Sequence, residues 1–154
     1  MRRLIFIVSV LSVVFLFSAC NSNSVILGEV FEEPVNDYEG VTMSIVDGTL
    51  SSTGATVCVL NTLDKWVDSG NEHDFGLQIE KNGKWYWLES GEEFANTAEA
   101  YMFLTDEPRE LKMSWGNRYG KLELGRYRIV KRFFNYEEPN NRVDFALACE
   151  FTLD

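Results

Sequence analysis

The sequence predicts an all-β fold: an antiparallel β-sandwich of about seven strands in a single domain. From Val41 onward, apolar and polar residues alternate with period two far more often than with the 3.6-residue period of a helix. Asn82-Gly83 separates two strand-like runs, which is a strong signal for a β-hairpin. The length of 154 residues fits one domain, and a hydrophobic content of 45% argues against disorder despite a formal net charge of −10.

Four strands are predicted in the first half of this region. Residues 41–45 alternate apolar and polar side chains, and residues 55–60 form a β-branched run that follows a glycine. Residues 75–80 alternate up to the Asn82-Gly83 turn, and residues 85–88 continue after it. The polar partners in each alternation indicate sheets with one face in water.

Three strands are predicted in the second half. Residues 111–115 alternate, residues 126–134 are a long strand candidate around Tyr127, Ile129 and Val130, and residues 145–153 alternate cleanly. Residues 92–104 are compatible with either one short helix or an irregular crossing. Two long loops, 64–74 and 136–144, are weak candidates for binding, because loops on a rigid sandwich are where binding usually varies.

The first nineteen residues have the layout of a secretory signal peptide. Arg2 and Arg3 provide a basic start, Leu4–Phe17 is apolar apart from two serines, and small residues follow. This apolar run has fourteen residues, fewer than the roughly 20 that a transmembrane helix needs. We therefore expect residues 1–19 to be a signal peptide rather than a stable membrane anchor.

Phe17-Ser18-Ala19-Cys20 resembles the lipobox of bacterial lipoproteins. In that family a diacylglyceryl group is attached to the cysteine thiol, and cleavage leaves this cysteine as the first residue of the mature chain. The resemblance implies lipidation at Cys20 and attachment to the extracytoplasmic face of the cell membrane, since two or three acyl chains hold a protein firmly. The sequence departs from the family at Phe17, where leucine is usual. An ordinary signal peptide with an incidental cysteine is the alternative.

Residues 20–40 are predicted to be the lipidated cysteine and an acidic tether. Asn21–Ser24 is polar, and five acidic residues crowd the stretch 29–39 around Pro34, so that like charges extend the chain. Without residues 1–19 the chain has 12 basic and 24 acidic side chains and a net charge of −12. Such a domain does not adhere to anionic headgroups by itself. Calcium binding by the tether stays open, although the ligand spacing of an EF-hand is missing.

The segment Tyr119–Lys131 resembles a core motif of bacterial immunoglobulin-like domains, which occur in secreted and membrane-attached proteins of Gram-positive bacteria. Its pattern is Tyr-Gly-x-Leu-x-x-Gly-x-Tyr-Arg-Ile. Weaker similarities in the same order extend the match over residues 41–153. The resemblance implies an immunoglobulin-like β-sandwich at residues 41–154, and it implies architecture more than activity.

Five residues of this motif are predicted to be structural. Gly125 permits a tight turn before a strand. Tyr127, two residues later, has the position of a tyrosine corner, whose hydroxyl bonds back across the turn. Leu122 and Leu124 are expected to pack beneath it, and Gly120 marks another turn.

The two cysteines of the domain are predicted to be unpaired. Outside the cytoplasm Cys58 and Cys149 could form a disulfide, but strand parity argues against it. Cys58 faces outward if Val57 and Val59 face the core, whereas Cys149 shares the inward face of its strand. We expect one buried and one more exposed thiol.

Other chemically distinctive residues have structural explanations. Trp85 and Trp87 share one face of a strand and Tyr86 lies on the other, so both faces of the strand are aromatic. One face belongs to the core. The other is either packed against neighbouring side chains, which is favoured, or a platform for sugar or protein. The basic residues of 126–132 are expected to pair with the acidic excess rather than to form a binding patch. His73 is expected to be a solvated loop residue.

Several function classes are excluded or disfavoured. The acidity argues against nucleic acid, and the sequence has no phosphate loop, nucleophile elbow, or His/Cys cluster for zinc. We therefore predict no catalytic residues, no cofactor and no metal. The leading function is a lipid-anchored interaction module for a protein or an envelope polymer. The alternatives are an accessory or regulatory subunit of a membrane protein and, less favoured, an envelope hydrolase.

Overall fold

The computed structural model describes residues 26–90, 99–138 and 141–154, and these residues form ten strands and one short helix. All seven predicted strands are present, and the all-β antiparallel sandwich is confirmed. In chain order the elements are β1 (Leu27–Val30), β2 (Val41–Ile45), β3 (Gly54–Asn61), β4 (Val67–Gly70), β5 (Gly76–Lys81), β6 (Lys84–Leu88), β7 (Ala100–Phe103), β8 (Arg109–Ser114), α1 (Gly116–Tyr119), β9 (Gly125–Glu138) and β10 (Asn141–Leu153).

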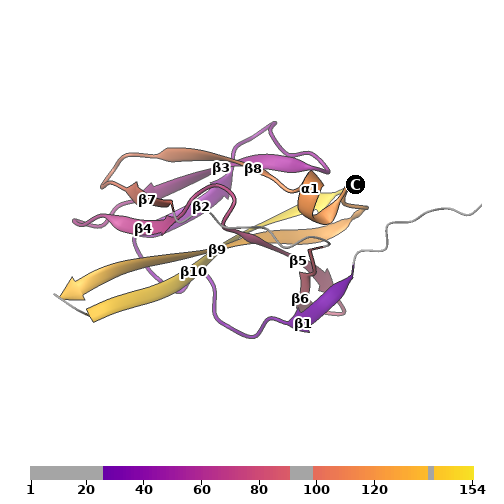
Figure 1. Ribbon diagram of the computed structural model, residues 1–154, viewed down its shortest axis with the longest axis horizontal. Coiled ribbons are helices and arrows are strands. Elements are labelled where there is room, and N and C mark those ends of the chain that lie inside the picture. Colours follow the sequence, from indigo (N-terminus) through magenta and orange to yellow (C-terminus); the bar gives the residue numbers. More distant parts are fainter. Residues whose placement is uncertain (1–25, 91–98, 139–140) are drawn as a thin grey trace, which may run out of the picture.

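The strands form two sheets, with every pair of named strands antiparallel. The small sheet has the order β2-β3-β8, and the large sheet has the order β1-β6-β5-β9-β4-β7, with β10 also paired to β9. β9 is long enough to pair with two strands in succession: Ile129 lies opposite Leu77 of β5, and Phe133 lies opposite Ser69 of β4. Figure 1 shows the result, with β5, β6 and β1 along one half of β9 and β4 and β7 along the other.

The hydrophobic core lies between the two sheets. In β3 alternate residues are buried, so Val57 and Val59 are fully enclosed while Cys58 between them points outward. Phe151 lies between the rings of Trp115 and Tyr127, with centroids 5.6 Å from each. Aromatic side chains therefore fill much of the space between the sheets.

The segment after Ile26 is docked, which differs from the extended tether expected through residue 40. β1 pairs with β6, and Phe31 packs edge-to-face on Trp87 with ring centroids 5.1 Å apart. The Asn36 side chain accepts a hydrogen bond from the Ala148 amide and donates one to the Ala148 carbonyl. We call residues 27–36 the N-terminal strap, because they cross the large sheet and cover part of the open edge of β10.

Three further expectations need correction. β4 lies inside the predicted loop 64–74, and β9 and β10 extend through most of the predicted loop 136–144. Within 92–104, residues 91–98 lie outside the described part of the chain, while residues 100–103 form β7 rather than a helix. Sheet pairing decides these short segments, which the local pattern alone does not. No described helix has the length and hydrophobicity needed to cross a bilayer.

Candidate interaction surface

Large apolar side chains are exposed at one end of the large sheet. Trp66, Met102, Leu104 and Tyr136 are 55%, 48%, 45% and 50% exposed, and the partly buried Phe134 lies beside them. Scattered single apolar residues are normal on a surface, but contiguous ones mark interaction sites.

The strand register brings these residues together. Asp68 of β4 lies opposite Met102 of β7 on one side and opposite Phe134 of β9 on the other. Val67 and Phe103 form the next pair and are buried, so Trp66 and Leu104, one position further, lie on the outward face. We call this surface the Trp66 face; it consists of Trp66, Asp68, Met102, Leu104, Phe134 and Tyr136.

An arginine is fixed on the border of the Trp66 face. The Arg142 guanidinium lies 3.9 Å from the centroid of the Phe134 ring, and its Nη2 is 2.5 Å from Oδ1 of Asp144. The hydrogen bond to Asp144 raises the pKa of Arg142 above its ordinary value. The ring of Tyr136 meets Phe134 edge-on with centroids 6.2 Å apart. Tryptophan, tyrosine and arginine are the residue types that dominate binding energy at protein interfaces.

The two loops expected to be binding candidates meet at this face. The segment 64–74 supplies Trp66 and Asp68, and the segment 136–144 supplies Tyr136 together with Arg142 and its partner Asp144. The pairing of β4 with β9 brings the segments together. Sequence reasoning missed Met102, Leu104 and Phe134. The four successive apolar residues 101–104 were a usable signal, because one side of a strand can bury only two of them.

The other aromatic pair is packed, as predicted. Phe31 of the strap covers Trp87, and the Arg128 guanidinium lies 4.4 Å from the centroid of Trp85. Arg128 is itself buried, and its Nε donates to Oε1 of Gln78 at 2.6 Å. This end of the large sheet is therefore already occupied by side chains of the same chain.

The basic residues of β9 are engaged within the molecule. Arg126 contacts Glu150 at 2.5 Å, and Arg132 contacts Glu33 of the strap at 2.7 Å, so both pair with acidic residues as predicted. Lys131 instead is 1% exposed and donates to three backbone carbonyls. These residues hold the fold together and do not form a basic binding patch.

The residues of the Tyr119–Lys131 motif occupy structural positions. The Tyr127 hydroxyl donates to the carbonyl of Glu123 at 3.1 Å, which is the hydrogen bond across the turn that a tyrosine corner makes. Gly120 and Gly125 have φ values of 71° and 157°, a region that favours glycine. Leu122 is buried.

Leu124 does not pack beneath this turn, contrary to the prediction: it is 73% exposed. β9 begins only at Gly125, so no strand alternation applies before it. The backbone amide of Leu122 donates to the Ser52 carbonyl at 2.9 Å, which draws Leu122 but not Leu124 inward.

Among the described residues, the cysteines lie at structural positions and the histidine at an exposed one. Cys20 lies outside the described residues. Cys58 and Cys149 are both free; Cys58 is half-buried and Cys149 is buried, as predicted. Burial raises the pKa of Cys149 to about 12, which keeps it in the unreactive thiol form. His73 is exposed, with Nε2 3.9 Å from Oε1 of Glu72.

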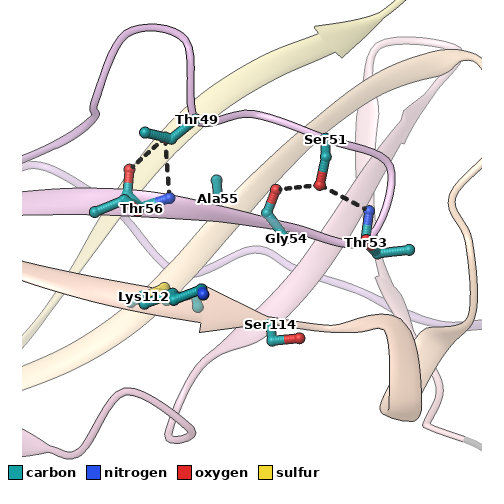
Figure 2. Close-up of a pocket in the computed structure, with 9 residues that line it drawn as sticks. Thr49, Ser51, Thr53, Gly54, Ala55, Thr56, Lys112 and Ser114 are labelled. Atoms are coloured by element: carbon teal, nitrogen blue, oxygen red, sulfur yellow. Dashed lines mark hydrogen bonds between the residues drawn. The ribbon is translucent and has the colours of Figure 1, made fainter.

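A shallow hollow of about 180 Å³ lies on the small sheet and is lined by hydroxyl groups (Figure 2). The hydroxyl of Thr49 donates to the Val46 carbonyl at 2.7 Å and accepts from the Thr56 amide at 3.0 Å. The Ser51 hydroxyl donates to the Gly54 carbonyl at 2.9 Å. These bonds close the turn before β3. Among the residues that the structure describes, no group of three His, Cys, Asp or Glu could hold a metal ion.

The comparisons with known proteins concern most of the folded region. A family model described as a bacterial Ig-like domain matches residues 37–149. No curated protein and no solved structure matches the chain. The matched residues include every described strand except β1, and the match extends through most of β10.

Proposed function

The chain belongs to the family of bacterial Ig-like domains, and from this premise we propose that it is a non-catalytic interaction module anchored by lipid at the extracytoplasmic face of the cell membrane. Domains of this family are generally not catalytic, and their fold supplies a rigid support for variable surfaces. The module binds a protein through the Trp66 face. The anchor is the lipidated Cys20, and no cofactor takes part.

The observation that carries this proposal is the exposure of the Trp66 face. Four large apolar side chains are each about half exposed across three neighbouring strands. At the other end of the large sheet, Trp87 is covered by Phe31. An exposed apolar cluster of this kind favours association, and it is retained where a partner buries it.

A second candidate function, an accessory subunit of a membrane protein, is favoured by the docking of the N-terminal strap. β1 begins at Leu27, so seven peptide units separate it from Cys20. At 3.3–3.6 Å per residue these units span at most about 25 Å. A domain held by lipid at Cys20 therefore stays beside the bilayer, where the most available partners are membrane proteins.

The anchor is tested by replacing Cys20 with serine in the full chain. We expect the wild-type protein in the membrane fraction with the added mass of acyl chains, and Cys20→Ser in a soluble extracytoplasmic fraction or uncleaved. A wild-type chain that carries no lipid and leaves the membrane in high salt contradicts the lipid anchor.

The interaction is tested by chemical crosslinking in intact cells. We expect one discrete adduct from the wild-type chain and its loss in Trp66→Ala/Tyr136→Ala. The matched control is Leu124→Ala, which removes another exposed apolar side chain outside the Trp66 face and should preserve the adduct. Adducts that are equal in all three proteins would show that another surface makes the contact.

A further inference from the structure

We propose that the Trp66 face binds a protein segment that combines apolar side chains with lysine or arginine. This inference rests on the proposed function, because it names the partner of the same surface. It goes further by fixing the sign of the charge that the partner must bring.

Carboxylates are close to the Trp66 face, one within it and four near its residues in the sequence. Asp68 lies within it, Asp64 precedes Trp66 by two residues, and Asp106 and Glu107 follow Leu104. Glu137 follows Tyr136 in β9. In the described part of the chain none of these five carboxylates has a salt bridge. They are therefore available to a partner.

Cations near the face are fewer and mostly engaged. Arg142 is paired with Asp144 and lies over the Phe134 ring. Arg109 donates to the Met102 carbonyl at 3.2 Å and lies 4.0 Å from the centroid of Tyr101. Arg132, two residues before Phe134, is paired with Glu33, and Lys65 is the remaining cation close to the face in sequence. The local excess of negative charge favours a basic partner and disfavours an acidic one.

The same charges separate the classes of partner. Nucleic acid and anionic lipid carry phosphates, which five unpaired carboxylates repel. A sugar polymer can stack on Trp66 and Tyr136 and hydrogen-bond to Asp68. It has no apolar groups to match the exposed side chains of Met102 and Leu104. Methionine, aromatic residues and arginine are instead the side chains enriched at protein interfaces. A basic, apolar protein segment therefore fits the face best.

Aromatic and acidic residues should contribute differently to binding. Buried aromatic residues at the centre of an interface control the dissociation rate and the affinity. Charged residues at its rim chiefly control the association rate and its dependence on salt. The two contributions can be separated by substituting the aromatic residues in one variant and the acidic residues in another.

The experiment uses a random library of 12-residue displayed peptides as the probe and the full chain in mild detergent as the target. We expect the enriched peptides to carry two or more Lys or Arg residues among apolar ones. For the best peptide, Trp66→Ala/Tyr136→Ala should lower the affinity about 30-fold. Asp68→Asn/Asp106→Asn/Glu137→Gln should lower it about 10-fold at low salt and remove most of its salt dependence.

The matched control neutralises three acidic residues away from the face: Glu39→Gln/Asp47→Asn/Glu110→Gln. These residues are exposed, and this control should leave both affinity and salt dependence unchanged. Thermal unfolding followed by circular dichroism checks that every variant is folded. Equal effects of the two acidic triple variants would overturn the inference, because the charge effect would then be non-specific.

Three other outcomes are decisive. Neutral or acidic peptides that still require Trp66 and Tyr136 would overturn the basic partner and leave the proposed function intact. Peptides that bind independently of Trp66 and Tyr136 would contradict the proposed function itself. Binding of a purified wall polymer that is lost in the aromatic double variant, with no peptide enriched, would replace the protein partner with a glycan.

Discussion

At the scale of single residues, Lys131 is the most unusual side chain of the core. Its Nζ donates to the carbonyls of Gly70, Asn71 and Asp74 at 2.9, 2.8 and 2.8 Å, and so holds the loop between β4 and β5 against β9. Loss of water around the buried ammonium lowers the pKa of Lys131 to about 8, although the negative charges of Asp74 and Glu72 act against this shift. The loop is thus held by a cation that is costly to bury.

Lys131→Met should destabilise the protein by about 2–3 kcal/mol, since three carbonyls lose a charged donor. The pKa of Lys131 is lower in the folded state than in the unfolded state, where it is 10.5. At Lys131 the unfolded chain therefore binds more protons between pH 8 and 10.5, so the contribution of Lys131 to the free energy of unfolding rises with pH in that window. Urea unfolding at several pH values measures it.

Lys131→Met is the control for this pH dependence, because it keeps every other titrating group, including Cys149. The raised pKa of Cys149 makes stability fall above pH 9 in both proteins. The difference in unfolding free energy between wild type and Lys131→Met should therefore increase from pH 8 to 10.5. A difference that stays constant or shrinks over this range contradicts the depressed pKa of Lys131.

The two domain cysteines should differ in reactivity. Cys149 is 8% exposed and its raised pKa disfavours the thiolate, whereas Cys58 lies half-buried on the outward side of β3. At pH 8 a thiol reagent should modify Cys58 in the native protein and Cys149 only after denaturation. Peptide mass mapping identifies the modified residue. Modification of Cys149 first in the native protein would contradict the placement of its strand.

At the scale of elements, Asn36 attaches the end of the N-terminal strap to β10. Its side chain makes two hydrogen bonds to Ala148, and its own backbone amide donates to the Ala146 carbonyl at 2.9 Å. The side-chain amide has both a donor and an acceptor, so it imitates a neighbouring strand at the edge of β10. Its φ of 59° is a conformation that asparagine tolerates better than most residues.

Asn36→Gly isolates the side-chain hydrogen bonds, because glycine keeps the positive φ without strain. We expect it to lower stability by about 1–2 kcal/mol and to accelerate hydrogen exchange at the Ala148 amide. Asn36→Ala should cost about 1 kcal/mol more, since alanine is strained at this φ. If exchange at Ala148 is unchanged in both variants, the strap is not held by Asn36.

The long and regular strands could be predicted from the sequence, whereas the short ones could not. β3 alternates in burial over all eight of its positions, and β10 runs for thirteen residues around five successive buried apolar ones, so both read clearly as strands. β4 has only four residues and includes the buried Ser69, whose hydroxyl donates to the Arg132 carbonyl at 2.6 Å. A polar residue that is buried because a distant strand accepts its hydrogen bond has no local signature.

The candidate site could be predicted only in part for the same reason. The segments 64–74 and 136–144 were identified as variable loops, but their meeting depends on the pairing of Asp68 with Phe134. A contact between residues so far apart in the chain is set by the register of the whole sheet. The exposure of Leu124, which was expected to be buried, likewise depends on where β9 begins.

At the scale of the whole molecule, the two halves of β9 have different surroundings. β5, β6 and the N-terminal strap lie along its first half and cover their own aromatic residues. β4 and β7 lie along its second half (Figure 1), where the side chains of the Trp66 face are exposed. The strap connects the folded domain to the proposed lipid anchor through a short segment. The molecule thus combines a covered end that stabilises the fold with an exposed end that we propose binds a partner.

Site-specific photocrosslinking in intact cells tests this central claim most directly. A photoreactive amino acid replaces Met102 in the Trp66 face or, as control, Thr42 on the exposed side of β2 in the small sheet. The account predicts one discrete protein adduct from position 102 in the membrane fraction, its loss in a chain that also carries Trp66→Ala/Tyr136→Ala, and no adduct from position 42. An adduct from position 42 together with none from position 102 would contradict the Trp66 face as the binding surface.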